Sequence, residues 1–504
     1  MKRLALIIGA MLLATPAMAG YRDLKRELEA YTPPAMLRAP ARPATPPHPV
    51  KDGVDTSLAS LRQMRDRWAA AVDSPSSAAW HGSIPPAVRA AAGDDREAVD
   101  LLRSKLSLPV VDALIAMRNP AVKASRNRFQ AALEGFDQVA AAEEILHQYS
   151  AFTEGVMPGV GPMVGMDGIA ARFPFPGVTA LKGQVADRNV AIQKAAMDLT
   201  LRDRLAQGRK AYWNLAYVHR ARTITREMRD RFDHLESVAT TRYTAGRTSY
   251  QDVIKIRIGR EKLSEQLVTL AAQQINLETE LLALVDLPPG PTIGTPNREH
   301  PTTTLPDVEA LYPLALEHRQ ELVRLRAMVD KMERMVEMGE TMLRPPFSSG
   351  QALFTDEAIL QAGSVGMKPA FGTTVSPVRG KGTPANAWFG TRDAYLYETR
   401  RNLAARKADL ADAETQTHPL VRTGWYDLDF ALREWRLYRQ RLLELAQTSL
   451  EVTTRGYESG SVSFADVTGA YTGWLEIHLT TERRNSDVGI ARAELERRIG
   501  APLP

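Results

Sequence analysis

One phrase of eleven residues occurs twice in the sequence, and this repetition constrains the fold more than any other feature. Residues 243–253 read YTAGRTSYQDV, and residues 457–467 read YESGSVSFADV. Both copies place a tyrosine, a glycine, a serine, an aromatic residue and an Asp-Val pair at the same spacing. The chain therefore needs the same local geometry at two distant places.

The offset of 214 residues between the two copies extends beyond the phrase itself. It also relates Tyr212 to Tyr426 and Val238 to Val452 without any gap. Self-similarity over such a range is typical of a duplicated structural unit. The sequence therefore predicts an internal repeat, with two copies of one unit of roughly 200 residues.

The residues of the phrase are those of a tight turn between two antiparallel helices. Gly246 suits the left-handed conformation that closes a helix C-terminus. Ser249 is a good N-cap for the next helix, and Asp252 completes a capping-box-like pattern near the positive end of the helix dipole. The second copy supplies the same parts in the same order, as Gly460, Ser463 and Asp466.

The segments around the phrase are long and helical in pattern. Residues 183–242 contain no proline, and a helix of that length would span roughly 90 Å, which suits a coiled coil or a tube. After the first phrase, apolar residues recur in steps of three and four, and only Arg260 and Gln274 interrupt this heptad seam. The apolar members of the seam are Val253, Ile256, Leu263, Leu267, Leu270, Leu277, Leu281 and Leu284. With further helical stretches over 394–456 and 464–499, the sequence predicts a mainly α fold of long antiparallel coiled-coil helices with few or short β-strands.

The N-terminus has the composition of a secretory signal peptide. A basic start precedes an apolar run that is too short for a lasting membrane helix, and an A-x-A cleavage site ends at Ala19. The mature chain is therefore expected to begin near Gly20 and to be exported. Residues 33–49 are rich in proline and predict an extended tether.

Composition excludes several classes of function. The formal net charge of +5 is small for 504 residues, and arginine alternates with glutamate as on solvated helix faces, which argues against a nucleic-acid-binding protein. The chain has no cysteine, so disulfides and thiolate chemistry are excluded. The nine histidines lack the spacing of a helical metal site, and no nucleophile motif occurs. We expect a protein that is not an enzyme and that uses no metal or other cofactor.

Together these features resemble the TolC-like outer membrane efflux family, the outer membrane factors. Its members have two repeats, each with a Y-x-x-G-x-x-S/T-x-x-D-V hairpin and a coiled-coil helix that ends near L-x-x-x-x-G-x-P. Here the helix ends read LLALVDLPPG and LERRIGAPLP. The starts ALIAMRNPAV and, more loosely, ALEHRQELV are similar to the family's AL-x-x-NP-x-L. The resemblance covers about residues 99–500.

The resemblance divides the chain into five segments. They are a signal peptide (1–19), a proline-rich N-terminal extension (20–98), repeat 1 (99–286), a proline-rich linker (287–305) and repeat 2 (306–500). The sequence assigns no function to the extension.

The resemblance also implies a homotrimeric tube that acts as the channel or tunnel component of a tripartite efflux or secretion system. In the family, the hairpins form a periplasmic tip that meets a periplasmic adaptor, and the adaptor is joined to an inner-membrane pump. The implied location is the cell outer membrane or the periplasm associated with it. The residues expected at the tip, in contact with the adaptor, are Tyr243, Gly246, Ser249, Tyr250, Asp252, Val253, Tyr457, Gly460, Ser463, Phe464, Asp466 and Val467.

Two aspartates match positions at which the family has a pore gate. Asp466 matches a residue that forms a ring in the closed pore, and Asp252 matches one that joins a closing ion-pair network. The second pore aspartate is Gly469 here, and the clasp arginine is Val462, so the family's gate chemistry is incomplete. Helix capping alone is the alternative role for both aspartates.

The family usually has a twelve-stranded barrel in the outer membrane, but the windows for its strands are unusual here. Residues 152–180 contain four prolines, and residues 346–393 hold Pro and Gly without sustained alternation. We therefore expect a reduced or missing β-barrel. A periplasmic helical scaffold or interaction protein without an open pore is the alternative function.

Overall fold

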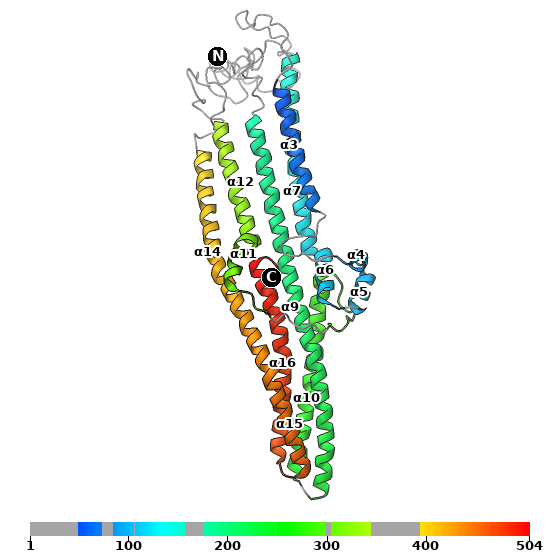
Figure 1. Ribbon diagram of the computed structural model, residues 1–504. Helices are drawn as coiled ribbons and strands as arrows, with labels where there is room; N and C mark the ends of the chain where they lie inside the picture. The colour runs from blue at the N-terminus through cyan, green and yellow to red at the C-terminus, as the bar shows by residue number, and fades with distance from the viewer. Residues whose placement is uncertain are drawn as a thin grey trace, which may run out of the picture. The chain divides into compact units, whose positions relative to one another are not determined.

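The structure is a computed structural model, and every regular element in its described part is helical (Figure 1). It describes residues 49–72, 84–104, 106–156, 176–246, 248–297, 304–343 and 394–503. The elements are α3 (Pro49–Val72), α4 (Pro86–Ala90), α5 (Asp95–Ser104), α6 (Leu108–Arg118), α7 (Pro120–Val156), α9 (Pro176–Thr244), α10 (Tyr250–Leu284), α11 (Val308–His318), α12 (Gln320–Leu343), α14 (Ala394–Leu437), a π-helical turn η4 (Tyr438–Leu442), α15 (Leu443–Ser459) and α16 (Phe464–Ile499). The expected mainly α class with long helices is confirmed.

Some of the expectations concern residues outside this part. The signal peptide, 1–19, lies there, as do residues 157–175 and 344–393, which hold most of the two windows for reduced strands. Those expectations stay predictions. None of the described helices combines the length and the apolar character that a membrane crossing requires.

The chain divides into two compact units, and several long helices contribute residues to both. The first unit comprises 1–67, 133–187 and 330–404, and the second comprises the remaining residues. In the first unit, α3 packs on α9, because Gly183 leaves no room for a Cβ beside Leu61. An ion pair of 2.6 Å between Arg67 and Asp187 joins the same two helices.

In the second unit, α9 has a neighbouring helix on each side. On one side, Arg257 of α10 donates a hydrogen bond of 2.6 Å to the Glu236 carboxylate. On the other side, the rings of Phe232 and Tyr471 of α16 meet edge to face, with centroids 5.8 Å apart. The two contacts lie within about one turn of α9, which therefore packs against both α10 and α16.

The fourth member of the row is α15, which packs on α16. Trp474 is buried, and its indole Nε1 donates to the Gln447 side-chain oxygen of α15 at 2.6 Å. The helices of the row therefore follow the order α10, α9, α16, α15. Figure 1 shows these four helices running side by side towards the two turns that connect them.

The heptad seam predicted along α10 is confirmed. Its two polar interruptions both reach across to α9, where Arg260 binds Glu236 at 3.0 Å and Gln274 accepts a hydrogen bond from Arg222. These two polar residues therefore stabilise the pairing of α10 with α9 and do not disrupt it. The buried seam residues are Val253, Ile256, Leu263, Leu270, Leu281 and Leu284.

The predicted helix over 394–456 is interrupted by a feature that the sequence did not reveal. The π-helical turn η4 separates α14 from α15, and no side chain in it is buried. A π turn inserts one residue into the helical register, so the apolar stripe shifts at this point.

The proline-rich linker, as far as it is described, packs against the start of repeat 1. The Gly294 amide donates to the Leu102 carbonyl at 3.1 Å, and the Asn297 amide donates to the Leu106 carbonyl at 2.9 Å. These bonds hold residues 294–297 beside the end of α5 and Leu106, two residues before α6 begins. The repeat boundaries themselves stay a prediction.

In both halves of the chain, a hydrogen bond joins the C-terminal end of a hairpin helix to the break between two earlier helices. Asn119, between α6 and α7, donates from its side chain to the Leu284 carbonyl at 2.8 Å. Gln320, just after the break at Arg319 between α11 and α12, donates to the Gly500 carbonyl at 2.7 Å. The C-terminal ends of α10 and α16 are therefore anchored in similar ways.

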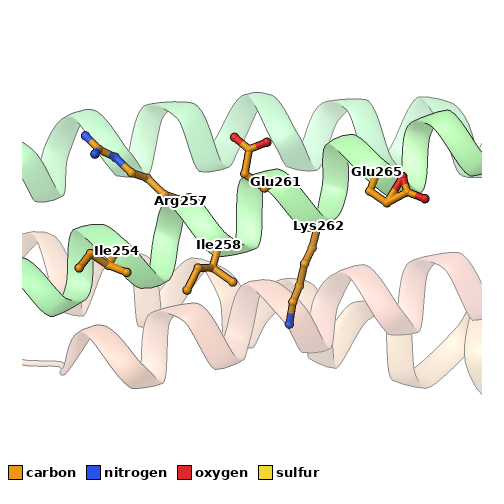
Figure 2. A pocket seen from close by; sticks show the side chains of 6 residues that line it. All are labelled: Ile254, Arg257, Ile258, Glu261, Lys262 and Glu265. Carbon is orange, nitrogen blue, oxygen red and sulfur yellow. The ribbon is translucent and has the colours of Figure 1, made fainter.

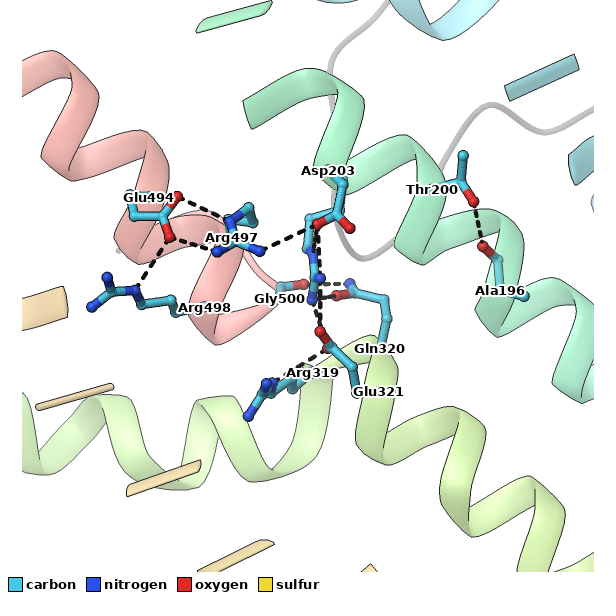
Figure 3. A network of polar contacts seen from close by, with 11 residues as sticks. Ala196, Thr200, Asp203, Arg319, Gln320, Glu321, Glu494, Arg497, Arg498 and Gly500 are labelled. Atoms are coloured by element: carbon cyan, nitrogen blue, oxygen red, sulfur yellow. Dashed lines mark hydrogen bonds and ion pairs between the residues drawn. The ribbon is translucent and has the colours of Figure 1, made fainter. Parts of the chain in front are cut away.

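A partly buried ionic network surrounds the second of these anchors (Figure 3). The Arg202 side chain on α9 is 5% exposed, and it donates to both Glu321 oxygens at 2.7 and 2.8 Å. Arg497 of α16 pairs with Glu494 at 2.6 Å and lies 3.6 Å from Asp203. The interpretation of these charges as solvated helix faces is wrong here, because the network joins α9, α12 and α16.

The charge of Glu321 depends on Arg202. Burial opposes ionisation of this carboxyl, but the hydrogen bonds and the positive charge of Arg202 outweigh burial and lower the pKa of Glu321 from 4.5 to about 2. A carboxyl whose pKa is depressed on folding stabilises the fold above its unfolded-state pKa, and this contribution is lost as the pH falls towards the folded pKa.

We predict that Glu321→Gln lowers the free energy of unfolding near pH 7 by about 2–3 kcal/mol, because the variant removes the carboxylate that binds two nitrogens of the buried Arg202 and leaves Arg202, among the described residues, only the carboxylate of Asp203 at 2.9 Å. The difference in the free energy of unfolding between wild type and variant should disappear as the pH falls from 4.5 to about 2. Chemical denaturation followed by circular dichroism at several pH values measures this. A difference in the free energy of unfolding that keeps its size near pH 2 would contradict the role given to the Glu321–Arg202 ion pair.

Gly500 is required by both its conformation and its surroundings. Its φ is +84°, and a Cβ there would lie 2.7 Å from the Arg319 Cα and 2.8 Å from the His318 carbonyl oxygen.

We predict that Gly500→Ala lowers the free energy of unfolding by about 2 kcal/mol or more. Gly473→Ala, in the same helix, is the matched control, because no atom lies within 4 Å of its Cβ position. It should be neutral or stabilising by about 0.5–1 kcal/mol, and equal losses in both variants would refute the prediction.

Candidate functional site

The first copy of the phrase forms the turn between α9 and α10. Gly246 has a φ of +70°, and its amide donates to the Tyr243 carbonyl at 2.9 Å. The Ser249 hydroxyl accepts a hydrogen bond of 3.1 Å from the Gln251 amide and so caps α10. The predicted turn and N-cap are both present.

The second copy forms the turn between α15 and α16. Gly460 has a φ of +84°, its amide donates to the Tyr457 carbonyl at 3.0 Å, and the Ser461 amide donates to the Gly456 carbonyl at 2.8 Å. This pair of bonds is a Schellman motif. The Ser463 hydroxyl accepts from the Asp466 amide at 3.2 Å and caps α16.

The two aspartates of the phrase accept hydrogen bonds from nearby hydroxyl groups. Asp252 accepts from the Thr248 hydroxyl at 2.6 Å, and Asp466 accepts from the Ser463 hydroxyl at 2.7 Å. Each carboxylate thus stands at the positive end of a helix dipole with a local donor. This geometry provides the capping role, and a gate role for Asp252 and Asp466 stays a prediction.

The apolar residues of the phrase anchor the turns to the row of helices. Val253 and Val467 are buried, and so are Tyr457 and Phe464, whose ring centroids lie 5.8 Å apart. These side chains join an apolar cluster that also includes Phe232. The turns are therefore held rigidly at the ends of their helices.

The corresponding aromatic residues of the first copy are displayed at the surface. Tyr243 is 44% exposed and Tyr250 is 48% exposed, with ring centroids 5.2 Å apart. The two copies share one sequence pattern, but the aromatic pair of the second copy is buried and that of the first copy is exposed. An exposed pair of tyrosines is well suited to contact a partner protein.

Arg242 joins the two turns, and the sequence did not single it out. Its guanidinium donates to the Tyr457 carbonyl at 2.6 Å and lies 4.6 Å from the centroid of that ring. The equivalent position in the second copy is Gly456, so the repeated phrase gives no sign of this contact. Arg242 therefore joins the two turns, and the adaptor contact expected of the twelve tip residues stays a prediction.

The two family positions that differ in this sequence also lie at this surface. Val462 is half-buried, and it packs beside Gly456, where a Cβ would meet its side chain. Gly469 is exposed on α16, with no atom within 4 Å of its Cβ position. Neither residue supplies a charge, so the carboxylates of the two phrases are Asp252, Asp466 and Glu458.

Above the tip, ionisable side chains belong to the contacts between helices. Burial lowers the pKa of both His219 and His478, which favours their neutral forms. Among the described residues, no group of three or more His, Asp or Glu side chains is arranged to hold a metal ion. The paired turns are thus the feature that sequence and structure single out together.

No protein-family model and no curated protein matches the sequence. Solved structures do match. The channel CusC superposes with a TM-score of 0.57 at 10% identity, covering 79% of this chain and 93% of that one. The outer-membrane channel OprN gives 0.53 at 12% identity, with coverages of 85% and 95%. The open state of the Neisseria gonorrhoeae MtrE outer membrane channel gives 0.53 at 12% identity, with coverages of 79% and 92%.

At identities this low, the similarity establishes the fold. The chain has the fold of the TolC-like outer membrane channels, the family that its sequence resembles.

Proposed function

We propose that this chain forms, as a homotrimer, the channel or tunnel component of a tripartite efflux or secretion system. It would carry substrates across the periplasm towards or through the outer membrane. The proposal is supported by the fold of the solved outer membrane channels OprN and MtrE. The N-terminal sequence of a secretory signal peptide agrees with a site of action beyond the inner membrane.

The observation that carries the proposal is the joined pair of turns. Two hairpins of a channel fold end together, and Arg242 holds them in contact through the Tyr457 carbonyl. The exposed rings of Tyr243 and Tyr250 form an aromatic surface beside this contact. We propose that this surface, with the other residues of both phrases, docks a periplasmic adaptor that is joined to an inner-membrane pump.

We further propose that Asp252 and Asp466 stand where such a channel would narrow. In three copies these carboxylates would form acidic rings, which attract cations and repel anions in a narrow passage. The gate would be weaker than that of the family, because Gly469 and Val462 supply no charge. Capping and gating are compatible, because a capping carboxylate keeps its charge.

The proposed assembly is tested with the full chain, purified from membranes or from the periplasm. Native mass spectrometry should give three times the mass of the mature chain, and planar lipid bilayers should show discrete conductance steps. A monomer in mild conditions would contradict the homotrimer. An intact oligomer that never conducts would instead favour the periplasmic scaffold without an open pore.

The gate is tested by removing one charge. Asp466→Asn should reduce the cation-to-anion permeability ratio about twofold or more, because it neutralises the ring. Its free energy of unfolding should stay within about 1 kcal/mol of the wild type, because Ser463 remains the N-cap and the asparagine side-chain oxygen can still accept from the Ser463 hydroxyl, so mainly the interaction with the helix dipole is lost. Reversal potentials in a salt gradient measure the ratio.

Glu458→Gln is the matched control for the gate. It removes the same charge from an exposed residue in the last turn of α15, outside the capping positions. If the permeability ratio changes equally in both variants, or does not change in Asp466→Asn, Asp466 acts as a helix cap alone.

A further inference from the structure

His478 lies at the point where α16 meets a helix on each of its sides. One turn before it, Trp474 donates to the Gln447 side chain of α15 at 2.6 Å. One turn after it, Glu482 lies 3.5 Å from Arg220 of α9. Residues four apart share one face of a helix, so His478 stands on the face between the two neighbours. Its ring also meets the Trp474 ring edge to face, with centroids 4.7 Å apart.

The π-helical turn η4 runs past the same place. On one side of His478, Glu434 of α14 lies 3.6 Å from Arg484, and on the other side is the bond from Trp474 to α15. Because the paired helices are antiparallel, counting inward from both contacts puts Leu442, the last residue of η4, opposite His478. No side chain of η4 is buried, so the packing on α16 is weakest at this turn. A π turn inside a helix is frequently a functional feature.

Two buried polar atoms at this junction have no hydrogen-bond partner among the described residues. They are the Nδ1 atom of His478 and the hydroxyl of Thr225, a fully buried residue of α9. The ring of Phe232 meets that of Tyr471, and Thr225 and His478 each lie two turns further from the tip along their helices. The two unpaired atoms therefore stand at one level of the α9–α16 contact. Such atoms are rare in folded proteins, and a pair of them requires an explanation.

Charged groups face the His478 ring from α9, η4 and α16. They are Glu482 on α16, Arg220 and Glu227 on α9, and Arg439 on η4. Two acids and two arginines oppose one another, so burial decides the direction and lowers the pKa of His478 below its usual 6.5. The neutral ring is therefore the form that fits the packed junction.

We infer that His478 is a proton-operated contact, which holds η4 and α15 against α16 while its ring is neutral and releases them when the ring is protonated. Protonation makes Nδ1 a hydrogen-bond donor, and in the packed junction this atom has no acceptor among the described residues. The ring must move to find one, and the Thr225 hydroxyl is the acceptor at its level. The inference goes beyond the proposed function and does not depend on it, because it concerns the packing of α15 alone.

Acid weakens this contact, because a released ring takes up a proton more readily than the packed ring. A histidine whose pKa is lowered by packing leaves the contact intact above its usual pKa of 6.5. Stability is then lost as the pH falls from that value towards the lowered pKa.

Hydrogen–deuterium exchange of the full chain measures the release of α15. After correction for the intrinsic effect of pH, the protection of α15 amides should fall at least about threefold more than that of α10 between about pH 7.5 and pH 5.5. The reference helix α10 contains no histidine, and Figure 2 shows the charged side chains along part of it. Equal losses of protection in α15 and α10 would overturn the inference.

Two substitutions remove the proton site itself. His478→Phe keeps a ring beside Trp474 that cannot be protonated, and His478→Gln puts a neutral polar side chain there. Both should abolish the additional loss of α15 protection in acid. They differ in size and polarity, so a failure of one to fold leaves the other as the test. A loss of wild-type size in either folded variant would contradict the role of His478.

His219→Phe is the matched control. His219 on α9 is also half-buried, its Nε2 has no hydrogen-bond partner among the described residues, and burial lowers its pKa. It lies beside Arg222, which binds Gln274 of α10 and not α16. The acid response of α15 should therefore stay as in the wild type. Its abolition by His219→Phe would overturn the assignment to His478.

Nuclear magnetic resonance of the chain with labelled histidines measures His478 directly. Its Cε1 signal, assigned by its absence in His478→Gln, should titrate below pH 6.5. Thr225→Val keeps the shape of the side chain but removes the facing hydroxyl, so the pKa of His478 should fall further, by about 0.3 or more. A pKa of His478 at or above 6.5, or one that Thr225→Val leaves unchanged, would contradict the inference.

Conductance separates this contact from the proposed function. Conducting oligomers in which acid leaves α15 protected would overturn the contact and leave the channel in place. A chain that never conducts, but whose α15 is released by acid through His478, would support the contact and contradict the channel.

Discussion

The side-by-side packing of α9 with α10 and α16 is the constraint on which the rest of the structure depends. α9 has 69 residues, and a helix of this length has no globular core to bury it. It is stabilised only if apolar stripes along its whole length meet neighbouring helices. The buried residues Ile224, Met228 and Phe232 provide such a stripe above the tip. Both partner helices run antiparallel to α9, and tight turns join α9 to α10 and α15 to α16.

The turns and the anchors fix the two ends of these pairs. At the tip, positive-φ glycines reverse the chain, and Arg242 ties one turn to the other. At the opposite ends of α10 and α16, the amide side chains of Asn119 and Gln320 bind carbonyl groups that a helix end leaves free. The channel proposal depends on this arrangement, because a tip that docks a partner must be held in a defined place.

The sequence predicted those parts of the fold that depend on local patterns. The α10 seam follows from a heptad repeat, and the turns at Gly246 and Gly460 follow from residue types with strong conformational preferences. The residues of each pattern lie only a few positions apart in the sequence, so the pattern can be recognised without a structure. The capping roles of Ser249 and Ser463 were predictable for the same reason.

Contacts between distant segments could not be predicted in this way. The ion pair of Arg202 with Glu321 joins residues 119 positions apart, and the sequence around each resembles a solvated helix face. Tyr212 and Tyr426 hold equivalent positions in the repeat, yet the first is fully buried and the second is 55% exposed. The difference arises because α9 lies inside the row and α14 lies at its edge, which depends on tertiary position alone.

The central claim is that this row of helices, with both turns at one end, forms part of a tubular wall. Single-particle electron cryo-microscopy of the full chain, isolated with any bound adaptor, tests it most directly. The account predicts a closed ring of three copies, with all six turns at the same end. A monomeric particle, or an oligomer whose turns point to opposite ends, would contradict it.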